Sequence, residues 1–286
     1  MAKKTILDFR EMKKLGEKIT YVVAYDAHTA ARAEEAGIEM ILIGDSVEMS
    51  IYGKKNTLSA TMNKMITHAE AVRLGAPNTF IVGDMPFGSY EKSNRKAILN
   101  ARRFYERASV DAVKLEGGIG MAKRIKAIVN AKMNVMGHIG LTPQTASEFK
   151  AQGRTAEDAM KIIEDALAVE KAGAFAVLVE AVPPEVTEIM TKTLEIPVLS
   201  IGAGPFCDGQ LLLEIDLLGR GVVFKPKFVK VFAMQPLADI TRQAFQKYVK
   251  EVKAGTFPDI EKHCYKMIDG ELEKLTNRLH KTTKHH

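Results

Sequence analysis

The stretch at residues 40–50, MILIGDSVEMS, decides the fold. Its first four residues form an apolar run without alternation, which is typical of a strand that is buried on both faces of a sheet. The run leads into a Gly-Asp pair that ends at Asp45, and the stretch FIVGDM at residues 80–85 repeats the pattern with Asp84. Two buried strands that each deliver an aspartate at their tip indicate a parallel sheet with polar groups gathered at one edge.

The same alternation of apolar run and amphipathic helix continues along nearly the whole chain. Eight apolar runs are expected to be strands: residues 19–26, 40–45, 80–85, 112–117, 135–141, 175–181, 197–204 and 222–226. A helical stretch is expected after each strand; residues 209–219, GQLLLEIDLLG, follow the seventh and residues 239–255 follow the eighth. Strict alternation of this kind predicts a parallel sheet covered by helices, and eight units in about 240 residues fit a (β/α)8 TIM barrel. An open doubly wound sheet is the alternative fold.

The domain organisation follows from the lack of any Pro/Gly/Ser-rich linker or low-complexity tract. We expect a helix over residues 4–16 before the first strand and a single catalytic barrel domain over residues 1–258. Residues 259–286 are expected to form a C-terminal helical extension that is partly mobile and ends in KTTKHH.

Composition sets the broad class. The chain has 286 residues, of which 46% are hydrophobic and 27% charged, as in a globular protein with a sizeable core. No apolar run approaches the roughly 20 residues that span a bilayer, and MAKKTILDFREMKK lacks the apolar centre of a signal peptide, so a cytoplasmic protein without membrane contact is expected. Cys207 and Cys264 form no CxxC pair and are expected to be free thiols. The net charge is +6, but the lysines are scattered and no basic stripe is interleaved with aromatics, which disfavours a nucleic-acid partner.

The predicted strand tips carry functional groups, and barrel active sites lie at the C-terminal ends of the strands. In chain order the tips hold Asp26, Asp45 with Ser46, Asp84, Lys114 with Glu116, His138, Glu180 and Ser200. Because the tips of a barrel converge on one mouth, Asp45, Asp84 and Glu116 are expected to face a shared polar cavity. Three carboxylates close together repel one another, and a hard cation such as Mg²⁺ removes that cost. The alternative is that an aspartate merely caps the helix or loop that follows it.

Three further tip residues suit enolate chemistry. Lys114 lies two residues before Glu116 on the same face, where it could form an ion pair or bind a substrate carboxylate or a developing enolate oxygen. Glu180 follows a very apolar strand, where desolvation would raise its pKa and make it a better general base; otherwise it is a carboxylate at a helix start. His138 could donate to a substrate or bond to the backbone. The set fits a 2-oxo acid chelated to Mg²⁺ that loses the proton next to its carbonyl.

The sequence resembles the ketopantoate hydroxymethyltransferase family from Thr5 to Asp259. The resemblance rests on the order of AYDAHTA, GDS, THAEAVRLGA, GDMPFGSY, AVKLEGG, MGHIGLTPQ, VEAVPPE, IGAGPFCDGQ and PKFVK. It implies a barrel of the phosphoenolpyruvate/pyruvate superfamily. It also implies transfer of a hydroxymethyl group from 5,10-methylenetetrahydrofolate to 3-methyl-2-oxobutanoate, giving 2-dehydropantoate on the route to pantothenate and coenzyme A.

The resemblance also implies roles for the tip residues and a homodecameric assembly. The metal positions fall on Asp45, Asp84 and Glu116, and the proton acceptor falls on Glu180. The 2-oxo acid would be bound by Asp45, Ser46, Asp84 and Lys114, with His138 as a further candidate. The cofactors implied are Mg²⁺ and the folate co-substrate.

The chain departs from the family pattern beside this site. The family usually has glycine where Glu48 stands and acidic residues where Asn63 and Lys64 stand. Glu48 is therefore expected to add negative charge near the metal-binding loop. Two other functions stay open at this point: a lyase or aldolase of the same superfamily that acts on another 2-oxo acid, and a non-catalytic barrel that serves as a scaffold.

Overall fold

A closed barrel of eight parallel strands forms the centre of the computed structural model, which describes residues 3–221 and 226–282. The strands are β1 Ile19–Val23, β2 Met40–Ile43, β3 Phe80–Asp84, β4 Ala112–Glu116, β5 Val135–Gly140, β6 Ala176–Glu180, β7 Val198–Ile201 and β8 Gly209–Leu213. Each strand pairs with its neighbours in chain order, and β1 pairs with β8 to close the ring. The (β/α)8 barrel is confirmed, and the open sheet is excluded.

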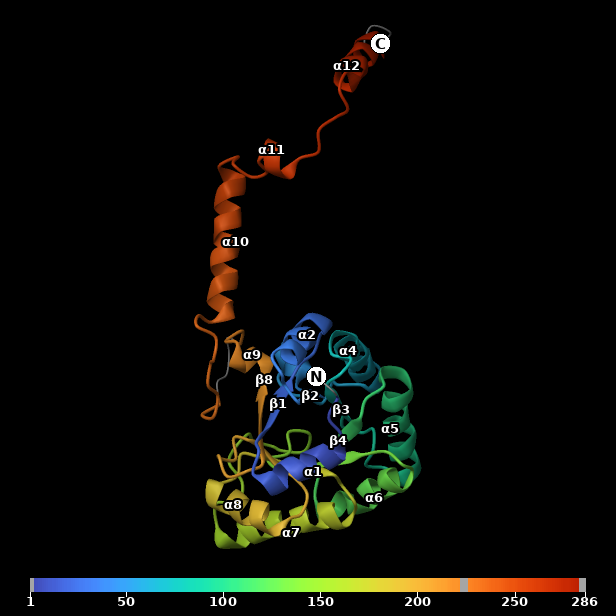
Figure 1. Ribbon diagram of the computed structural model, residues 1–286, viewed down its shortest axis with the longest axis vertical. Helices are drawn as coiled ribbons and strands as arrows, with labels where there is room; N and C mark the ends of the chain where they lie inside the picture. Colours follow the sequence, from blue (N-terminus) through green and yellow to red (C-terminus); the bar gives the residue numbers. More distant parts are fainter. Residues whose placement is uncertain (1–2, 222–225, 283–286) are drawn as a thin grey trace. The chain divides into compact units, whose positions relative to one another are not determined.

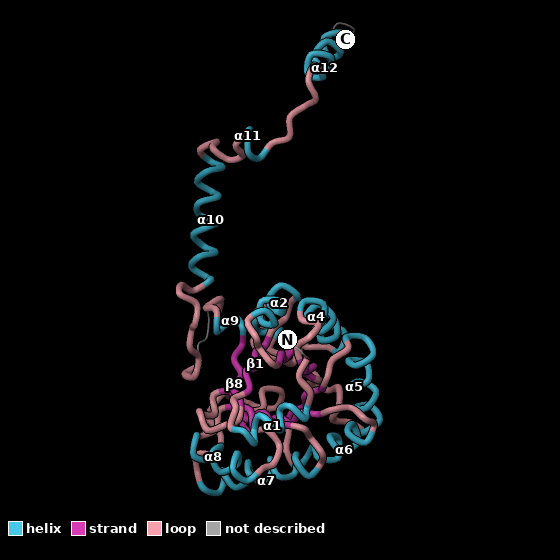
Figure 2. The backbone as a smooth tube through the Cα atoms, in the orientation of Figure 1, coloured by secondary structure: helices cyan, strands magenta, loops and turns pink. Residues whose placement is uncertain are grey.

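Helices cover the outside of the barrel. In chain order, the helices up to residue 217 are α1 Ile6–Leu15, α2 Ala27–Glu35, α3 Val47–Ser50, α4 Met62–Gly75, α5 Asn94–Ala108, α6 Ala122–Asn130, α7 Ala156–Lys171, α8 Pro184–Thr193 and α9 Glu214–Leu217, with a 3₁₀ turn at Ile119–Met121. Figures 1 and 2 show α2 and α4 to α8 around the strands. Polar caps start many of them: the side chains of Thr61, Ser93 and Thr155 each accept a hydrogen bond from the N–H three residues later.

The predicted N-terminal helix is confirmed as α1, and it closes the N-terminal end of the barrel. Thr5 and Asp8 form a capping box at its start, and Gly16 ends it in the left-handed region, with φ of 73°. The buried ring of Phe9 packs edge-on against Phe80 with centroids 5.1 Å apart, and Phe80 in turn lies 5.5 Å from Phe175. Phe80 stands at the start of β3, and Phe175 stands just before the start of β6. Together with Phe9 of α1, they fill the N-terminal end of the barrel with apolar surface.

The eighth strand lies elsewhere than expected. Residues 222–226 were expected to form it, but 222–225 lie outside the described residues, and β8 is instead Gly209–Leu213, where a helix was expected. A short leucine run has no periodicity that separates strand from helix, so pairing with β1 and β7 decides the outcome. Gly209 allows that pairing, since a Cβ there would come within 2.6 Å of the Ile19 carbonyl oxygen.

The chain divides into two compact units, residues 1–234 and 235–286. The second contains α10 Leu237–Lys253, α11 Ile260–His263 and α12 Glu271–Thr282. The expected division after residue 258 stays a prediction, and most of the predicted mobile end KTTKHH lies outside the described residues. None of the helices in the described ranges is long and apolar enough to cross a bilayer. Cys207 and Cys264 are free, as expected.

Candidate active site

The register of the barrel brings the predicted tip residues side by side. Asp84 is the partner of Lys114 across β3 and β4, and Glu116 is the partner of His138 across β4 and β5. The side chains of these four residues and of Asp45 are buried, each no more than 5% exposed. The mouth of the barrel therefore holds a cluster of charged groups that are withdrawn from bulk water.

The Asp84 side chain, at the tip of β3, contacts residues at the tips of both neighbouring strands, β2 and β4. Its Oδ1 lies 2.6 Å from Lys114 Nζ, and its Oδ2 accepts the backbone N–H of Asp45 at 3.1 Å. Lys114 Nζ also lies 3.7 Å from Glu116 Oε1. Burial lowers the pKa of Lys114, but the Asp84 and Glu116 charges outweigh it and raise that pKa above its usual value. Lys114 is therefore a fixed positive charge in the mouth.

His138 continues the row to the sixth strand. Its Nδ1 lies 3.3 Å from Glu116 Oε1, and its Nε2 lies 3.2 Å from Glu180 Oε2. Both ring nitrogens are buried, and neither contact meets the geometry of a hydrogen bond, so the carboxylates act on the ring as ion-pair partners. Burial and Lys114 lower the pKa of His138, but the two glutamates outweigh them and raise it to about 9. The positive charge of the His138 imidazolium thus orients the Glu180 carboxylate. The alternative role for His138, a hydrogen bond to the backbone, is not formed within the described part of the chain.

Glu180 is the carboxylate of this buried cluster that reaches solvent. Its side chain is 16% exposed, compared with 3% for His138 beside it. The Glu180 carboxylate is therefore more exposed to water than the apolar sequence of its strand predicted. An oxygen that is held by an imidazolium and open to the mouth can meet a substrate proton.

The cluster carries an excess of negative charge that suits a cation. Burial, followed by the charge of Asp84, raises the pKa of Asp45 well above its usual value, and burial also raises the pKa of Asp84. Both shifts mean that the two carboxylates are costly when ionised together. A hard divalent cation that binds carboxylate oxygens removes this cost, so the donor set fits Mg²⁺.

The geometry fits a particular mode of metal binding. Within residues 3–221 and 226–282, no three acidic, histidine or cysteine side chains converge closely enough to hold a metal by themselves. Glu116 Oε1 faces His138, and its Oε2 accepts the Gln144 backbone N–H at 3.0 Å; both oxygens of Asp84 are likewise engaged, by Lys114 and by the Asp45 N–H. Magnesium is usually bound through one or two carboxylates with several retained waters, which agrees with a cluster that offers few free carboxylate oxygens.

Sequence reasoning missed Gln144, which ties three parts of the site together. Its side-chain amide donates to Asp45 Oδ2 at 2.9 Å and to the Met85 carbonyl at 3.0 Å, and its Oε1 accepts the Tyr90 hydroxyl at 2.6 Å. Gln144 is 3% exposed. It follows β5 in a loop, outside the strand-tip pattern, so its position in the quoted stretch GLTPQ was the only signal.

Ser46 lies at the tip of β2, where Tyr25 holds it. The Tyr25 hydroxyl lies 2.9 Å from Ser46 Oγ and donates to Ser50 Oγ at 3.1 Å. Tyr25 follows β1, so two neighbouring strands fix the Ser46 hydroxyl beside Asp45.

Two predicted tip residues have local roles instead. Asp26 caps α2 by accepting the Thr29 N–H at 2.9 Å, and Ser200 accepts the Ala203 N–H at 3.0 Å within the turn after β7. Burial raises the pKa of Asp26, but its hydrogen bonds outweigh burial and lower that pKa overall. The capping alternative is therefore the correct one for Asp26.

The negative charge of Glu48 is balanced by its own neighbours. Its Oε1 lies 2.8 Å from Lys64 Nζ, and its Oε2 accepts the Ser59 hydroxyl. Burial raises the pKa of Glu48, but the contacts with Lys64 and Ser59 outweigh it and lower that pKa. The expected extra negative charge is neutralised within its own neighbourhood.

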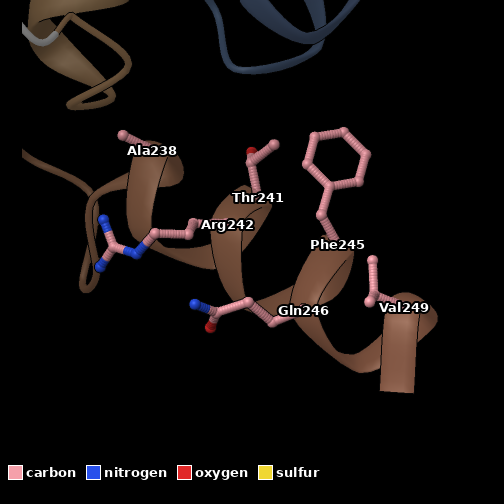
Figure 3. Close-up of a pocket in the computed structure, with 6 residues that line it drawn as sticks. All are labelled: Ala238, Thr241, Arg242, Phe245, Gln246 and Val249. Carbon is pink, nitrogen blue, oxygen red and sulfur yellow. The ribbon is translucent and has the colours of Figure 1, made fainter. Parts of the chain in front are cut away.

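A hollow in the second unit lies apart from this chemistry. Figure 3 shows its lining residues, which are Ala238, Thr241, Arg242, Phe245, Gln246 and Val249. All six belong to α10, which has no buried residue. A ligand site needs polar groups that converge from several elements, so this hollow is the open face of one helix.

Comparison with known proteins places the chain among close relatives. The profile of the ketopantoate hydroxymethyltransferase family matches residues 3–260. The chain is 53% identical over 278 residues to 3-methyl-2-oxobutanoate hydroxymethyltransferase of Alkaliphilus metalliredigens (strain QYMF), with 96% of this chain and 97% of that protein covered. The enzyme of the same name from Clostridium novyi (strain NT) is 48% identical over 276 residues, with 96% and 99% covered.

Solved structures are similar in fold. A phosphonopyruvate hydrolase in complex with oxalate and Mg²⁺ matches with a TM-score of 0.61 at 12% identity, covering 99% of this chain and 98% of that one. A 2,3-dimethylmalate lyase of the PEP mutase/isocitrate lyase superfamily matches with a TM-score of 0.57 at 15% identity, covering 98% and 99%. At these identities the likeness extends to the barrel architecture alone.

Proposed function

Because the chain belongs to the ketopantoate hydroxymethyltransferase family, we propose that it transfers a hydroxymethyl group to 3-methyl-2-oxobutanoate at the strand tips of its barrel. The product is 2-dehydropantoate, a precursor in pantothenate biosynthesis, and the donor is 5,10-methylenetetrahydrofolate. The observation that carries the proposal is the buried row of charges from Asp84 through Lys114, Glu116 and His138 to Glu180. Such a row costs folding free energy, so its place at the functional end of the strands indicates selection for chemistry.

Glu180 is the general base. Its carboxylate is the partly exposed end of the row, and His138 holds it from behind through Nε2 at 3.2 Å. It removes the proton from C3 of the 2-oxo acid, the carbon next to the carbonyl. The positive charge on His138 orients the carboxylate.

Lys114 and the residues around Asp45 bind the 2-oxo acid. Lys114 is a buried cation whose charge favours the oxygen on which negative charge develops as the proton leaves. Ser46, which follows Asp45 in the chain, presents a hydroxyl that Tyr25 holds in place. Asp45, Asp84 and Glu116 are the residues that would hold Mg²⁺. When bound, the metal would supply positive charge to the substrate's carboxylate and keto oxygens.

The transfer itself balances as follows. The C3–H bond breaks and its proton passes to Glu180, while C3 forms a bond to the one-carbon unit of the folate. The two C–N bonds of that unit break, and one water forms the new C–O bond of the hydroxyl group. The two folate nitrogens take up the proton from Glu180 and one proton from that water, which restores tetrahydrofolate. No oxidant or reductant is needed.

The assembly and setting complete the proposal. We infer a homodecamer in the cytoplasm, with small-molecule substrates and neither a nucleic-acid nor a membrane partner. The support is the family membership together with the scattered lysines of the sequence. Analytical ultracentrifugation of the full chain measures the assembly directly.

The activity test is product formation from 3-methyl-2-oxobutanoate, 5,10-methylenetetrahydrofolate and Mg²⁺, read by mass spectrometry as 2-dehydropantoate. Omitting the folate should abolish the product, and chelating the metal should do the same. A panel of other 2-oxo acids without folate separates transfer from a lyase reaction. Carbon–carbon cleavage of one of these, with no 2-dehydropantoate from the first mixture, would overturn the proposal.

A further inference from the structure

We propose that Glu48, Lys64 and Ser59 form a latch that positions Asp45 and Ser46 for the 2-oxo acid. The inference deepens the proposed function, since it assigns positioning residues to that same site. It starts from the burial of Glu48, a carboxylate with 0% exposure that the mechanism does not use.

The latch joins three segments that are separate in the chain. Glu48 stands in α3, Ser59 in the loop that follows, and Lys64 near the start of α4. Lys64 Nζ lies 2.8 Å from Glu48 Oε1, and the Ser59 hydroxyl donates to Glu48 Oε2. Both carboxylate oxygens are therefore used, and the loop between α3 and α4 is tied at both ends.

The backbone carries this constraint to the site. The Glu48 N–H donates to the Asp45 carbonyl at 3.1 Å, and the Met49 N–H donates to the Ser46 carbonyl at 3.0 Å. A shift of Glu48 therefore moves the turn on which Asp45 and Ser46 stand. Tyr25 fixes the same turn from the other side through Ser46 and Ser50.

A second series of contacts connects Lys64 with Tyr25 through Tyr52 and His68. Its Nζ lies 4.9 Å from the centroid of the Tyr52 ring, and the Tyr52 hydroxyl lies 3.0 Å from His68 Nε2. His68 Nδ1 lies 2.7 Å from the Tyr25 carbonyl, so Nδ1–H donates there and Nε2 accepts from Tyr52. The contacts thus close a ring around the turn that holds Asp45.

Because Glu48 is buried, its ionised form depends on the contacts with Lys64 and Ser59. A carboxylate without exposed surface is stable only while its cation and hydroxyl partners stay in place. Glu48 therefore admits one arrangement of α3 relative to α4. Of the three positions that depart from the family pattern in the resemblance described above, Glu48 and Lys64 are partners in space, whereas Asn63 accepts a hydrogen bond from Arg103.

The test compares charge-removing and charge-keeping changes at Lys64. Lys64→Met leaves the buried Glu48 carboxylate without its cation. It should lower kcat/KM for 3-methyl-2-oxobutanoate by about a hundredfold, mainly through KM, because the turn that carries Asp45 and Ser46 is displaced. The KM for the folate should not change. Lys64→Arg, which keeps a cation beside Glu48, should recover most of the loss. Lys192→Met, which breaks the exposed pair with Glu188, is the matched control and should match the wild type.

A readout that does not need turnover is hydrogen exchange of the backbone amides of residues 47–61. Faster exchange there in Lys64→Met, together with weaker calorimetric binding of the 2-oxo acid, supports the latch. A lower Tm with unchanged KM, kcat and exchange would overturn it. If Lys64→Met does not fold, Glu48→Gln, which keeps the contact with Ser59, takes its place and is judged by the same measurements. Absent turnover in the wild type would count against the proposed function, whereas the exchange result judges the latch by itself.

Discussion

The two ends of the barrel are built from the same strands and have opposite chemistry. Strand β3 begins at Phe80, whose ring packs on Phe9 and Phe175, and it ends at Asp84, whose carboxylate holds Lys114. The N-terminal end buries aromatic surface that stabilises the fold, while the C-terminal end buries charges that oppose folding. The difference teaches that stability and chemistry are separated along each strand, so a substitution at one end should change one property and leave the other.

The largest effect is expected from Asp45→Asn at the mouth. The variant keeps an oxygen that can accept from Gln144 but loses the charge that the proposed metal site needs. Turnover should fall to background. Because burial and the charge of Asp84 raise the pKa of Asp45, ionised Asp45 opposes folding at neutral pH, and the Tm of the variant should equal or exceed that of the wild type. Steady-state assays and thermal melts measure both; a large loss of Tm would break the contrast between the two ends.

The second effect concerns the base. Glu180→Gln keeps the shape of the side chain but cannot accept a proton, so exchange of the C3 proton of 3-methyl-2-oxobutanoate with D₂O should slow by about 10²–10⁴-fold. Proton NMR in D₂O with Mg²⁺ follows the exchange without folate. Glu185→Gln, in the first turn of α8, is the control. Exchange at the wild-type rate in Glu180→Gln would move the base to another residue, with His138 next.

The third effect belongs to the bottom of the barrel. Phe9→Ala removes a fully buried ring and should lower the free energy of unfolding by about 3–5 kcal/mol. At a temperature well below the melt, kcat and KM should stay at wild-type values, because Phe9 lies at the opposite end of the strands from the site. Urea titration gives the first quantity. Kinetic constants that fall together with stability would show that the two ends are coupled.

The smallest effect separates caps from functional acids within the mouth end itself. Asp26→Ala should cost about 1 kcal/mol, the usual value for a helix cap, with little change in kcat. The pKa of Asp26 is lowered in the folded state, so its contribution is present above its unfolded pKa and is lost as pH falls through the folded one. Wild type and variant should therefore converge in stability at acid pH. Melts between neutral and acid pH check this, and a constant gap would contradict it.

Much of the fold could be predicted from single stretches. Apolar runs such as residues 40–43 became strands, and the helix expected over residues 4–16 is α1. The eighth strand could not be predicted, because the leucines of Gly209–Leu213 suit either structure and the pairing partner in β1 is remote in sequence. Local pattern predicts an element when one face or one cap decides it, and fails when a distant strand decides it.

The same division holds for the site. That Asp84, Lys114, Glu116 and His138 lie together follows from barrel topology, because strand tips converge. Gln144 could not be found that way, since it stands in a loop. The pairing of Glu48 with Lys64 was equally hidden, because an irregular loop separates α3 from α4. Topology predicts which side chains meet, while loops decide how those side chains are held; the roles assigned to them stay predictions for the experiments above.

The pairing of β1 with β8 has a consequence for synthesis of the chain. The edge of residues 19–23 finds its last partner only when residues 209–213 have emerged from the ribosome. At ordinary elongation rates this takes roughly 10–40 s, during which the sheet is open and β1 presents unpaired N–H and C=O groups. We expect the nascent barrel to be prone to aggregation for that interval, because pairing between strands so distant in sequence forms slowly. Chains truncated before Gly209 should therefore collect in inclusion bodies or on chaperones, although they contain every residue assigned to catalysis.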